Sequence, residues 1–93
     1  MATYELIVWR GIPTVVEARD EGGVVSKPLS DKFQQLVDSA AIQLGLEGSE
    51  AYLEQWGRSA PAERPGGARE VAEAVAEELE ARFPTFIGQA FTR

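Results

Sequence analysis

The stretch Val8-Trp9-Arg10-Gly11-Ile12-Pro13 (VWRGIP) decides the fold of this chain, because one strand-forming segment ends there and another begins. Residues 3–10 are rich in β-branched and aromatic side chains and show no helical periodicity, which predicts a strand. Gly11 permits a positive φ. Pro13 fixes its own φ and removes a backbone donor, which is typical of a strand end or an edge strand.

Two further strands are predicted after this turn. Residues 14–19 read as the second strand, and residues 24–27 as a short third strand after the turn signal at residues 20–23. Since the links between these strands are too short for crossover connections, we expect an antiparallel hairpin or a small meander.

A long amphipathic helix follows, with Ser30 or Asp31 as its N-cap and Gly45 just beyond its end. Its apolar residues recur at helical spacing without a gap. They are Phe33, Leu36, Val37, Ala40, Ala41 and Leu44. This pattern predicts a helix that packs one face against the sheet.

A short second helix is predicted over residues 50–56, capped by Ser49 and ended by Gly57. Three of its side chains share one side, and the two aromatic ones are expected to close the core. The three are Tyr52, Leu53 and Trp56.

Residues 57–67 are predicted to be a loop, and residues 68–83 a third helix ended by Pro84. The tail, residues 85–91, is apolar enough that we expect it to pack back or to meet a partner. Residues 1–93 therefore form one α+β domain, with a small antiparallel sheet of two or three N-terminal strands covered on one face by three helices.

Composition excludes several classes of function. The 93 residues include no His and no Cys, and 15 acidic against 9 basic residues give a net charge of −6. Ser-His-Asp and Cys-His catalysis is therefore excluded, and so are the soft ligands of transition metals. The negative charge disfavours nucleic acid and anionic membranes. We predict no catalytic residue, no metal and no cofactor, and, without signal-peptide features, a cytoplasmic location.

Two other patterns have a plain structural interpretation. Carboxylates on the third predicted helix lack the spacing of a calcium loop, so we expect a solvated face and not a cation site. They are Glu70, Glu73, Glu77, Glu78 and Glu80. The pairs Gly22-Gly23 and Gly66-Gly67 lack the spacing and partner residues of a phosphate-binding loop, and we interpret them as turns.

The residues Trp9, Arg10, Ile12 and Pro13 support two interpretations. In the structural one, Trp9 is covered by its own domain, and Arg10 stacks on a ring or pairs with a carboxylate. In the functional one, a partner binds there, because Trp and Arg are enriched at interface hot spots and a rigid turn lowers the cost of ordering.

Two segments of the chain together carry a resemblance to a known family. One is Trp9-Arg10-Gly11-Ile12-Pro13, and the other runs from an Ala-Ala helix through Gly-Leu to an Ala-Tyr-Leu-Glu-x-Trp motif. The residues of the second segment are Ala40, Ala41, Gly45, Leu46, Ala51, Tyr52, Leu53, Glu54 and Trp56. Over residues 4–57 the chain resembles the small bacterial virulence factor domain family. Gly11 stands where that family has Asp, so no role of that carboxylate carries over.

The resemblance implies an accessory role. The family includes stand-alone proteins and the terminal part of a larger bacterial protein with an iron–sulfur-scaffold-like domain. Genes for folate- and corrinoid-dependent methyl transfer neighbour the stand-alone members. This distribution implies a module that serves a larger bacterial enzyme or assembly.

Two hypotheses follow. The first is a non-enzymatic interaction domain that docks on a larger bacterial protein, with the question of a homo-oligomer left open. Its candidate surface comprises Trp9, Arg10, Gly11, Ile12, Pro13, Tyr52, Trp56 and Arg58. The second is a small anionic-ligand domain or carboxylate-based enzyme that uses Arg10 or Arg58 with Trp9 or Trp56 as a stacking wall. A pocket lined by both an Arg and a Trp would favour the second hypothesis, and a flat patch the first.

The absence of His and Cys leads to a direct prediction about metals. The remaining oxygen ligands favour only hard cations and bind them weakly. Elemental analysis of the purified protein should therefore find no stoichiometric zinc, copper or iron. A bound equivalent of one of these metals that survives dialysis would contradict this.

Overall fold

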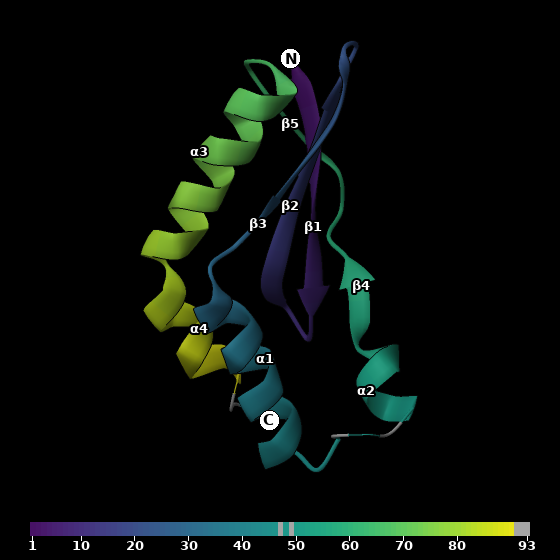
Figure 1. Cartoon of the computed structure of the whole chain (residues 1–93), viewed down its shortest axis with the longest axis vertical. Helices are drawn as coiled ribbons and strands as arrows, with labels where there is room; N and C mark the ends of the chain where they lie inside the picture. The colour runs from purple at the N-terminus through teal and green to yellow at the C-terminus, as the bar shows by residue number, and fades with distance from the viewer. Residues whose placement is uncertain (47, 49, 91–93) are drawn as a thin grey trace.

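The strands of the described chain form one antiparallel sheet in the order β3-β2-β1-β4, with β5 also pairing with β1 (Figure 1). The computed structural model describes residues 1–46, 48 and 50–90. The strands are β1 (Ala2–Trp9), β2 (Ile12–Asp20), β3 (Gly23–Pro28), β4 (Trp56–Arg58) and β5 (Ala62–Arg64). The predicted antiparallel arrangement of the N-terminal strands is confirmed.

The helices lie around this sheet in an α+β arrangement. They are α1 (Asp31–Gln43), α2 (Glu50–Glu54), α3 (Ala68–Ala81) and α4 (Phe83–Ala90). Helix α3 packs along β1, β2 and β3, while α1 and α4 contact each other below it (Figure 1). Helix α2 lies apart from them and contacts β4. Within the described residues, no helix is long and apolar enough to span a membrane.

Strand alternation divides the sheet into a core face and an open face. Tyr4 and Leu6 pack against the core, as do their cross-strand partners Ala18 and Val16. The intervening residues, Glu5 and its partner Glu17, lie on the other face. This division holds for Tyr4 to Leu6, whereas Trp9, beyond the register shift at Ile7 and Val8, belongs to the core cluster.

Pro13 lies near the start of β2, an internal strand, without disrupting the sheet. It is opposite Val8, beyond the point where β3 pairs with β2, since that pairing begins at Val15. The register shifts at Ile7 and Val8, and the Thr14 hydroxyl donates to the Ile7 carbonyl at 3.0 Å. The missing N–H of Pro13 therefore falls at a strand end, as the sequence predicts.

The predictions for residues 50–67 are wrong in part. Helix α2 ends at Glu54, and Trp56 begins β4, so Gly57 lies within a strand and does not end a helix. The predicted loop at 57–67 contains β5 and part of β4, which pair with opposite halves of β1. Between them Ser59 exchanges hydrogen bonds of 2.9 Å with the backbone of Leu6. Long-range pairing with β1 creates these strands, whose short sequences carry little strand propensity of their own.

The C-terminal region contains one helix more than predicted. Helix α3 ends at Ala81, not at residue 83, and Pro84 lies in the first turn of α4, where its missing N–H is tolerated. Phe86 and Ala90 of α4 are buried, and Phe86 and Phe83 both contact the Phe33 ring of α1 at an angle. The expectation that the tail packs back is thus confirmed as far as residue 90.

Carboxylates from elsewhere in the chain satisfy the first backbone donors of both long helices. Asp20, at the end of β2, accepts hydrogen bonds from the backbone N–H of Ala68 and of Gly22, each at 2.7 Å. Ser30 occupies the N-cap position of α1, but its hydroxyl and N–H both donate to Glu80 of α3 at 2.7 Å, so it does not cap its own helix. The predicted local cap is replaced by a tertiary one.

Asp20 should make stability depend on acid pH. Hydrogen bonds from Ala68 and then Gly22 lower the pKa of Asp20 below its ordinary value of 3.8. A carboxyl with a depressed folded-state pKa stabilises the fold above its unfolded-state pKa, and this contribution is lost as pH falls through the folded value. Asp20→Asn should therefore be less stable than wild type at pH 7, and the difference should shrink below about pH 4.

Denaturant midpoints measured from pH 7 to pH 3 test this expectation. Glu21→Gln removes an exposed neighbouring carboxylate and serves as the control, since no helix N–H donates to it. A difference between Asp20→Asn and wild type that stays constant over the whole range would contradict the assigned contact.

Candidate interaction surface

Trp9 is a core residue, although it was a candidate for the surface. Its side chain is 0% exposed, and its indole N–H donates to the Tyr52 carbonyl at 2.9 Å. The two rings lie 5.6 Å apart between centroids, in a tilted arrangement. A partner could not contact Trp9 without unfolding this end of the molecule, so its contribution is to hold the hairpin and α2 together.

Arg10 and Gly11 form the two-residue turn between β1 and β2. Their φ angles are 50° and 85°, and Trp9 and Ile12 on either side are paired, as in a type I′ hairpin. Gly11 adopts this conformation freely, whereas the left-handed conformation costs Arg10 about 1 kcal/mol. The backbone N–H of Arg10 donates to the Gln55 carbonyl at 3.3 Å. Its exposed guanidinium forms no ion pair with any other described residue.

Residues 9–13 therefore expose less surface to a partner than the sequence predicts. Ile12 and Pro13 are buried with Trp9, which leaves Arg10 and Gly11 exposed. The structural interpretation of this segment is correct for Trp9, which its own domain covers. It is not correct for Arg10, which has no carboxylate partner in the described chain. A binding role for the turn stays a prediction.

Tyr52 and Trp56 extend the aromatic cluster around Trp9. The Tyr52 and Trp56 rings meet edge to face with centroids 6.2 Å apart, and Trp56 is directly opposite Trp9 in the β1–β4 pair. Both side chains are half-buried. The two segments that carry the family resemblance thus contact each other.

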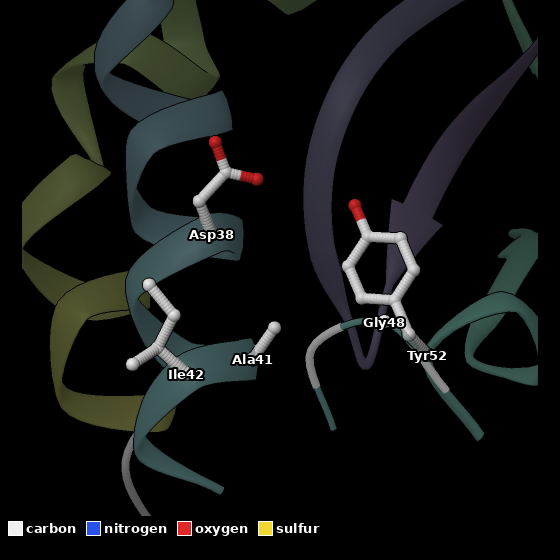
Figure 2. Close-up of a pocket in the computed structure, with 5 residues that line it drawn as sticks. All are labelled: Asp38, Ala41, Ile42, Gly48 and Tyr52. Carbon is white, nitrogen blue, oxygen red and sulfur yellow. The ribbon is translucent and has the colours of Figure 1, made fainter. Parts of the chain in front are cut away.

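An open pocket lies between α1 and α2 beside this cluster (Figure 2). Its volume is about 360 Å³, and Asp38, Ala41 and Tyr52 are among its lining residues. Figure 2 shows Ala41 directed toward Tyr52, with the Asp38 carboxylate and the Tyr52 hydroxyl on opposite sides of the gap.

Two exposed apolar side chains were not predicted: Ile42, which lines this pocket, and Leu53, which follows Tyr52 in α2. Ile42 is 60% exposed and Leu53 is 66% exposed. Leu53 was expected to share the core side of a longer helix, but α2 ends at Glu54 and leaves it in solvent. The available signal was that Ile42 falls outside the apolar stripe of α1.

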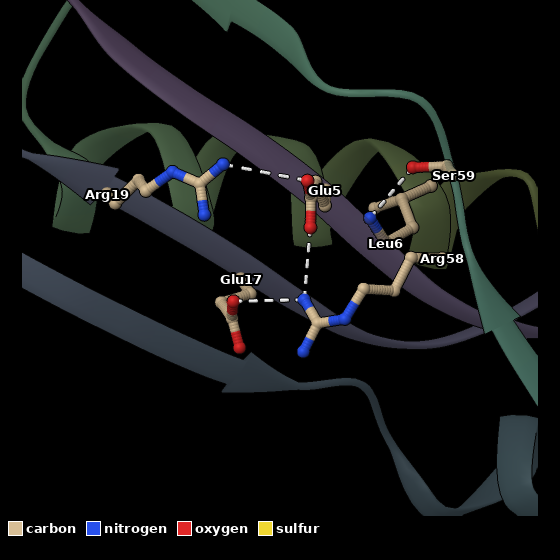
Figure 3. A network of polar contacts seen from close by, with 6 residues as sticks. All are labelled: Glu5, Leu6, Glu17, Arg19, Arg58 and Ser59. Carbon is tan, nitrogen blue, oxygen red and sulfur yellow. Dashed lines mark hydrogen bonds and ion pairs between the residues drawn. The ribbon is translucent and has the colours of Figure 1, made fainter.

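Arg58 is committed to an ion-pair network on the open face of the sheet (Figure 3). Its Nη1 lies 3.0 Å from Glu5 Oε2 and 3.0 Å from Glu17 Oε1, and Arg19 Nη2 lies 3.6 Å from Glu5 Oε1. Glu5 and Glu17 are directly opposite each other on β1 and β2, an unfavourable like-charge pair that Arg58 neutralises. Hydrogen bonds from Arg58 to Glu17 and then to Glu5 raise the pKa of the Arg58 guanidinium.

A second pocket, of about 450 Å³, opens on the same face. Trp56 lines it together with Ile7 and Val15 of the sheet, but no Arg does. Of four pockets in the described part of the chain, none is lined by both an Arg and a Trp. The arrangement that the anionic-ligand hypothesis required is absent from these four. Nor do three potential metal-ligating side chains come together within the described residues.

Comparison with known proteins identifies one family. The sequence profile of a family described as Virulence factor matches residues 7–86. This match spans both segments of the resemblance and also α3, which the resemblance did not include. No curated protein and no solved structure matches the chain significantly.

The charge arrangement at Arg58 leads to a stability prediction. Arg58→Ala should lower the melting temperature, because Glu5 and Glu17 would lose the cation that bridges them, and Arg19 contacts Glu5 alone, at 3.6 Å. Added Glu17→Gln should restore part of the loss, and high salt should reduce it by screening. Thermal unfolding of the single and double variants tests this. Arg69→Ala, which removes an exposed Arg on α3, should show no such loss, and an unchanged melting temperature in Arg58→Ala would rule the expectation out.

Proposed function

We propose that this chain, which belongs to the family described as Virulence factor, is a non-catalytic interaction domain that docks on a larger bacterial protein. The docking end comprises the exposed turn between β1 and β2, the pocket between α1 and α2, and the apolar side chains beside them. Its residues are Arg10, Gly11, Ile42, Tyr52 and Leu53. The observation that carries this proposal is the exposed guanidinium of Arg10, which has no ion pair with any other residue that the structure describes.

The backbone of Arg10 supports a role for its side chain. Asn or Gly would occupy a turn position with a φ of 50° at lower cost, so stability alone does not favour Arg there. Backbone strain that the surrounding structure maintains is typical of functional positions. The buried ring of Trp9 and the hydrogen bond to Gln55 fix the turn, which reduces the entropy lost when a partner binds Arg10.

The surroundings of the turn have the composition of a protein interface. Exposed Ile42 lines the pocket with Tyr52, and exposed Leu53 follows Tyr52 in α2, so both add apolar area to this end of the molecule. Arg and Tyr are enriched at interface hot spots, and the apolar residues around them exclude water from the contact. Tyr52 connects the two parts of the docking end, since its carbonyl binds the Trp9 indole and its ring lines the pocket.

The perturbed ionisable groups favour a binding role over a carboxylate-based enzyme, because each has a structural partner. Asp20 holds the first N–H of α3, and Glu80 holds Ser30 and lies 3.5 Å from Lys32. Glu78 lies 2.7 Å from Arg64, whose hydrogen bond lowers the pKa of the Glu78 carboxyl. A perturbed pKa in a cleft indicates a functional candidate, but structural ion pairs and hydrogen bonds perturb pKa values too, and such partners account for the shifts of these three groups.

For the partner we propose a cytoplasmic bacterial enzyme or assembly. The family resemblance directs the search toward folate- or corrinoid-dependent one-carbon metabolism and toward iron–sulfur proteins. These classes define the purified proteins to test first for binding, alongside proteins retained from a bacterial extract on the immobilised chain.

Arg10→Asn separates stability from binding. Asn tolerates a positive φ, so the melting temperature of this variant should equal or slightly exceed that of wild type. Affinity for the partner should fall by about 30-fold or more, the loss expected at a hot spot. Thermal unfolding and partner titration on the same protein sample provide the two measurements.

Arg69→Asn is the matched control, since it removes an exposed Arg from α3, outside the docking end. It should leave partner affinity unchanged. Equal affinity of a partner for Arg10→Asn and for wild type would contradict the assignment of Arg10 to the docking end.

A further inference from the structure

The pocket on the open face of the sheet has an apolar floor built by cross-strand register. Ile7 pairs with Val15, and Val15 pairs with Pro28, so three apolar residues lie in one row across β1, β2 and β3. They share the face of Glu5 and Glu17. Ile7 lies two residues from Glu5 on β1, Val15 lies two residues from Glu17 on β2, and Pro28 is opposite Val15. Trp56 of β4 and the first turns of α1 complete the pocket.

The polar groups at the rim of this pocket offer a negative charge and a carbonyl acceptor. The carboxylate of Asp31 lies in the first turn of α1, where the helix dipole favours it; it is exposed and has no hydrogen bond or ion pair with another described residue. The adjacent Lys32 does not compensate it, since its ammonium lies 3.5 Å from Glu80 and 4.9 Å from the centre of the Phe83 ring. The amide nitrogen of Gln34 donates to Asp38 at 3.1 Å, which leaves its carbonyl oxygen as an acceptor.

Trp56 contributes an aromatic wall. Its ring is half-buried and held edge to face against Tyr52, and its indole N–H has no partner among the described residues. Such a ring binds a cation that reaches its face, and Trp is the strongest of the aromatic residues in this respect. The nearby Arg58 does not offset the charge of Asp31, because two carboxylates already neutralise it.

We propose that this pocket binds an arginine side chain of a basic partner segment. The aliphatic part of the arginine lies against Ile7, Val15 and the Trp56 ring, and its guanidinium donates to Asp31 and Gln34. The net charge of −6 and the exposed carboxylate of Asp31, which has no ion pair with another described residue, favour a basic partner. The planar guanidinium can stack on Trp56 while it donates to a carboxylate, which a lysine ammonium cannot do. This site goes beyond the docking end, with which it shares no residue.

A defined peptide tests this site without knowledge of the natural partner. The probe is acetyl-Gly-Leu-Arg-Leu-Gly-amide, and its control is the same peptide with citrulline, an uncharged analogue, in place of arginine. Titration of the isotope-labelled full chain should shift the NMR signals of Ile7, Val15, Asp31 and the Trp56 indole with the arginine peptide. The citrulline peptide should bind at least about fivefold more weakly.

Matched variants locate the binding. Asp31→Asn should weaken the arginine peptide about fivefold. Glu73→Gln, the same loss of charge on the exposed face of α3, should leave binding unchanged. Trp56→Phe keeps an aromatic wall and should retain more binding than Trp56→Leu, with thermal unfolding checking that both are folded. Arg10→Asn should bind the peptide normally, so this test does not depend on the docking end.

Several results would overturn the proposal. They are equal binding of the arginine and citrulline peptides, equal weakening in Asp31→Asn and Glu73→Gln, or shifts confined to the docking end. The absence of any shift at millimolar peptide would overturn it as well.

Discussion

The hydrogen bond from the buried Trp9 indole to the Tyr52 carbonyl is the contact on which one whole end of this molecule depends. Helix α2 has five residues and buries none of them fully, so it is too short to be stable by itself. It is held by Trp9, by the Arg10–Gln55 backbone contact and by the pairing of β4 with β1. Without this ring, the turn, α2 and β4 would lose their common support.

The remaining polar contacts mostly join segments that are distant in the sequence. Ser59 completes the edge of β1 between two short strands, and Asp20 and Glu80 satisfy the starts of helices to which they do not belong. Arg58 allows two glutamates to face each other on neighbouring strands. A chain of this size buries a limited apolar core, so such contacts contribute to specifying one arrangement of its elements.

The ion pairs within the fold also indicate which charged side chains remain available to bind a partner. Arg58, a candidate binding residue from its type and position, forms ion pairs with Glu5 and Glu17. Arg10 and Asp31 have no partner in the described chain. These two groups have opposite sign. The backbone of Arg10 contacts Gln55, next to α2, and Asp31 lines a pocket with the half-buried Trp56. The two proposals rest on this difference between charges that are compensated and charges that are not.

The sequence by itself determined the N-terminal antiparallel strands, the buried stripe of α1, the α+β class and the two family segments, because all of these depend on local periodicity, turn residues or residue identity. It also located Trp9, Arg10, Trp56 and Arg58 as residues of interest without showing which were accessible. Only the tertiary structure decided that β4 and β5 are strands and that Trp9 is buried. It also decided that Arg58 is paired, while Arg10 has no ion pair among residues 1–46, 48 and 50–90. The physical reason is that burial and pairing depend on which distant segments meet, and no local pattern in residues 50–67 records their contact with β1.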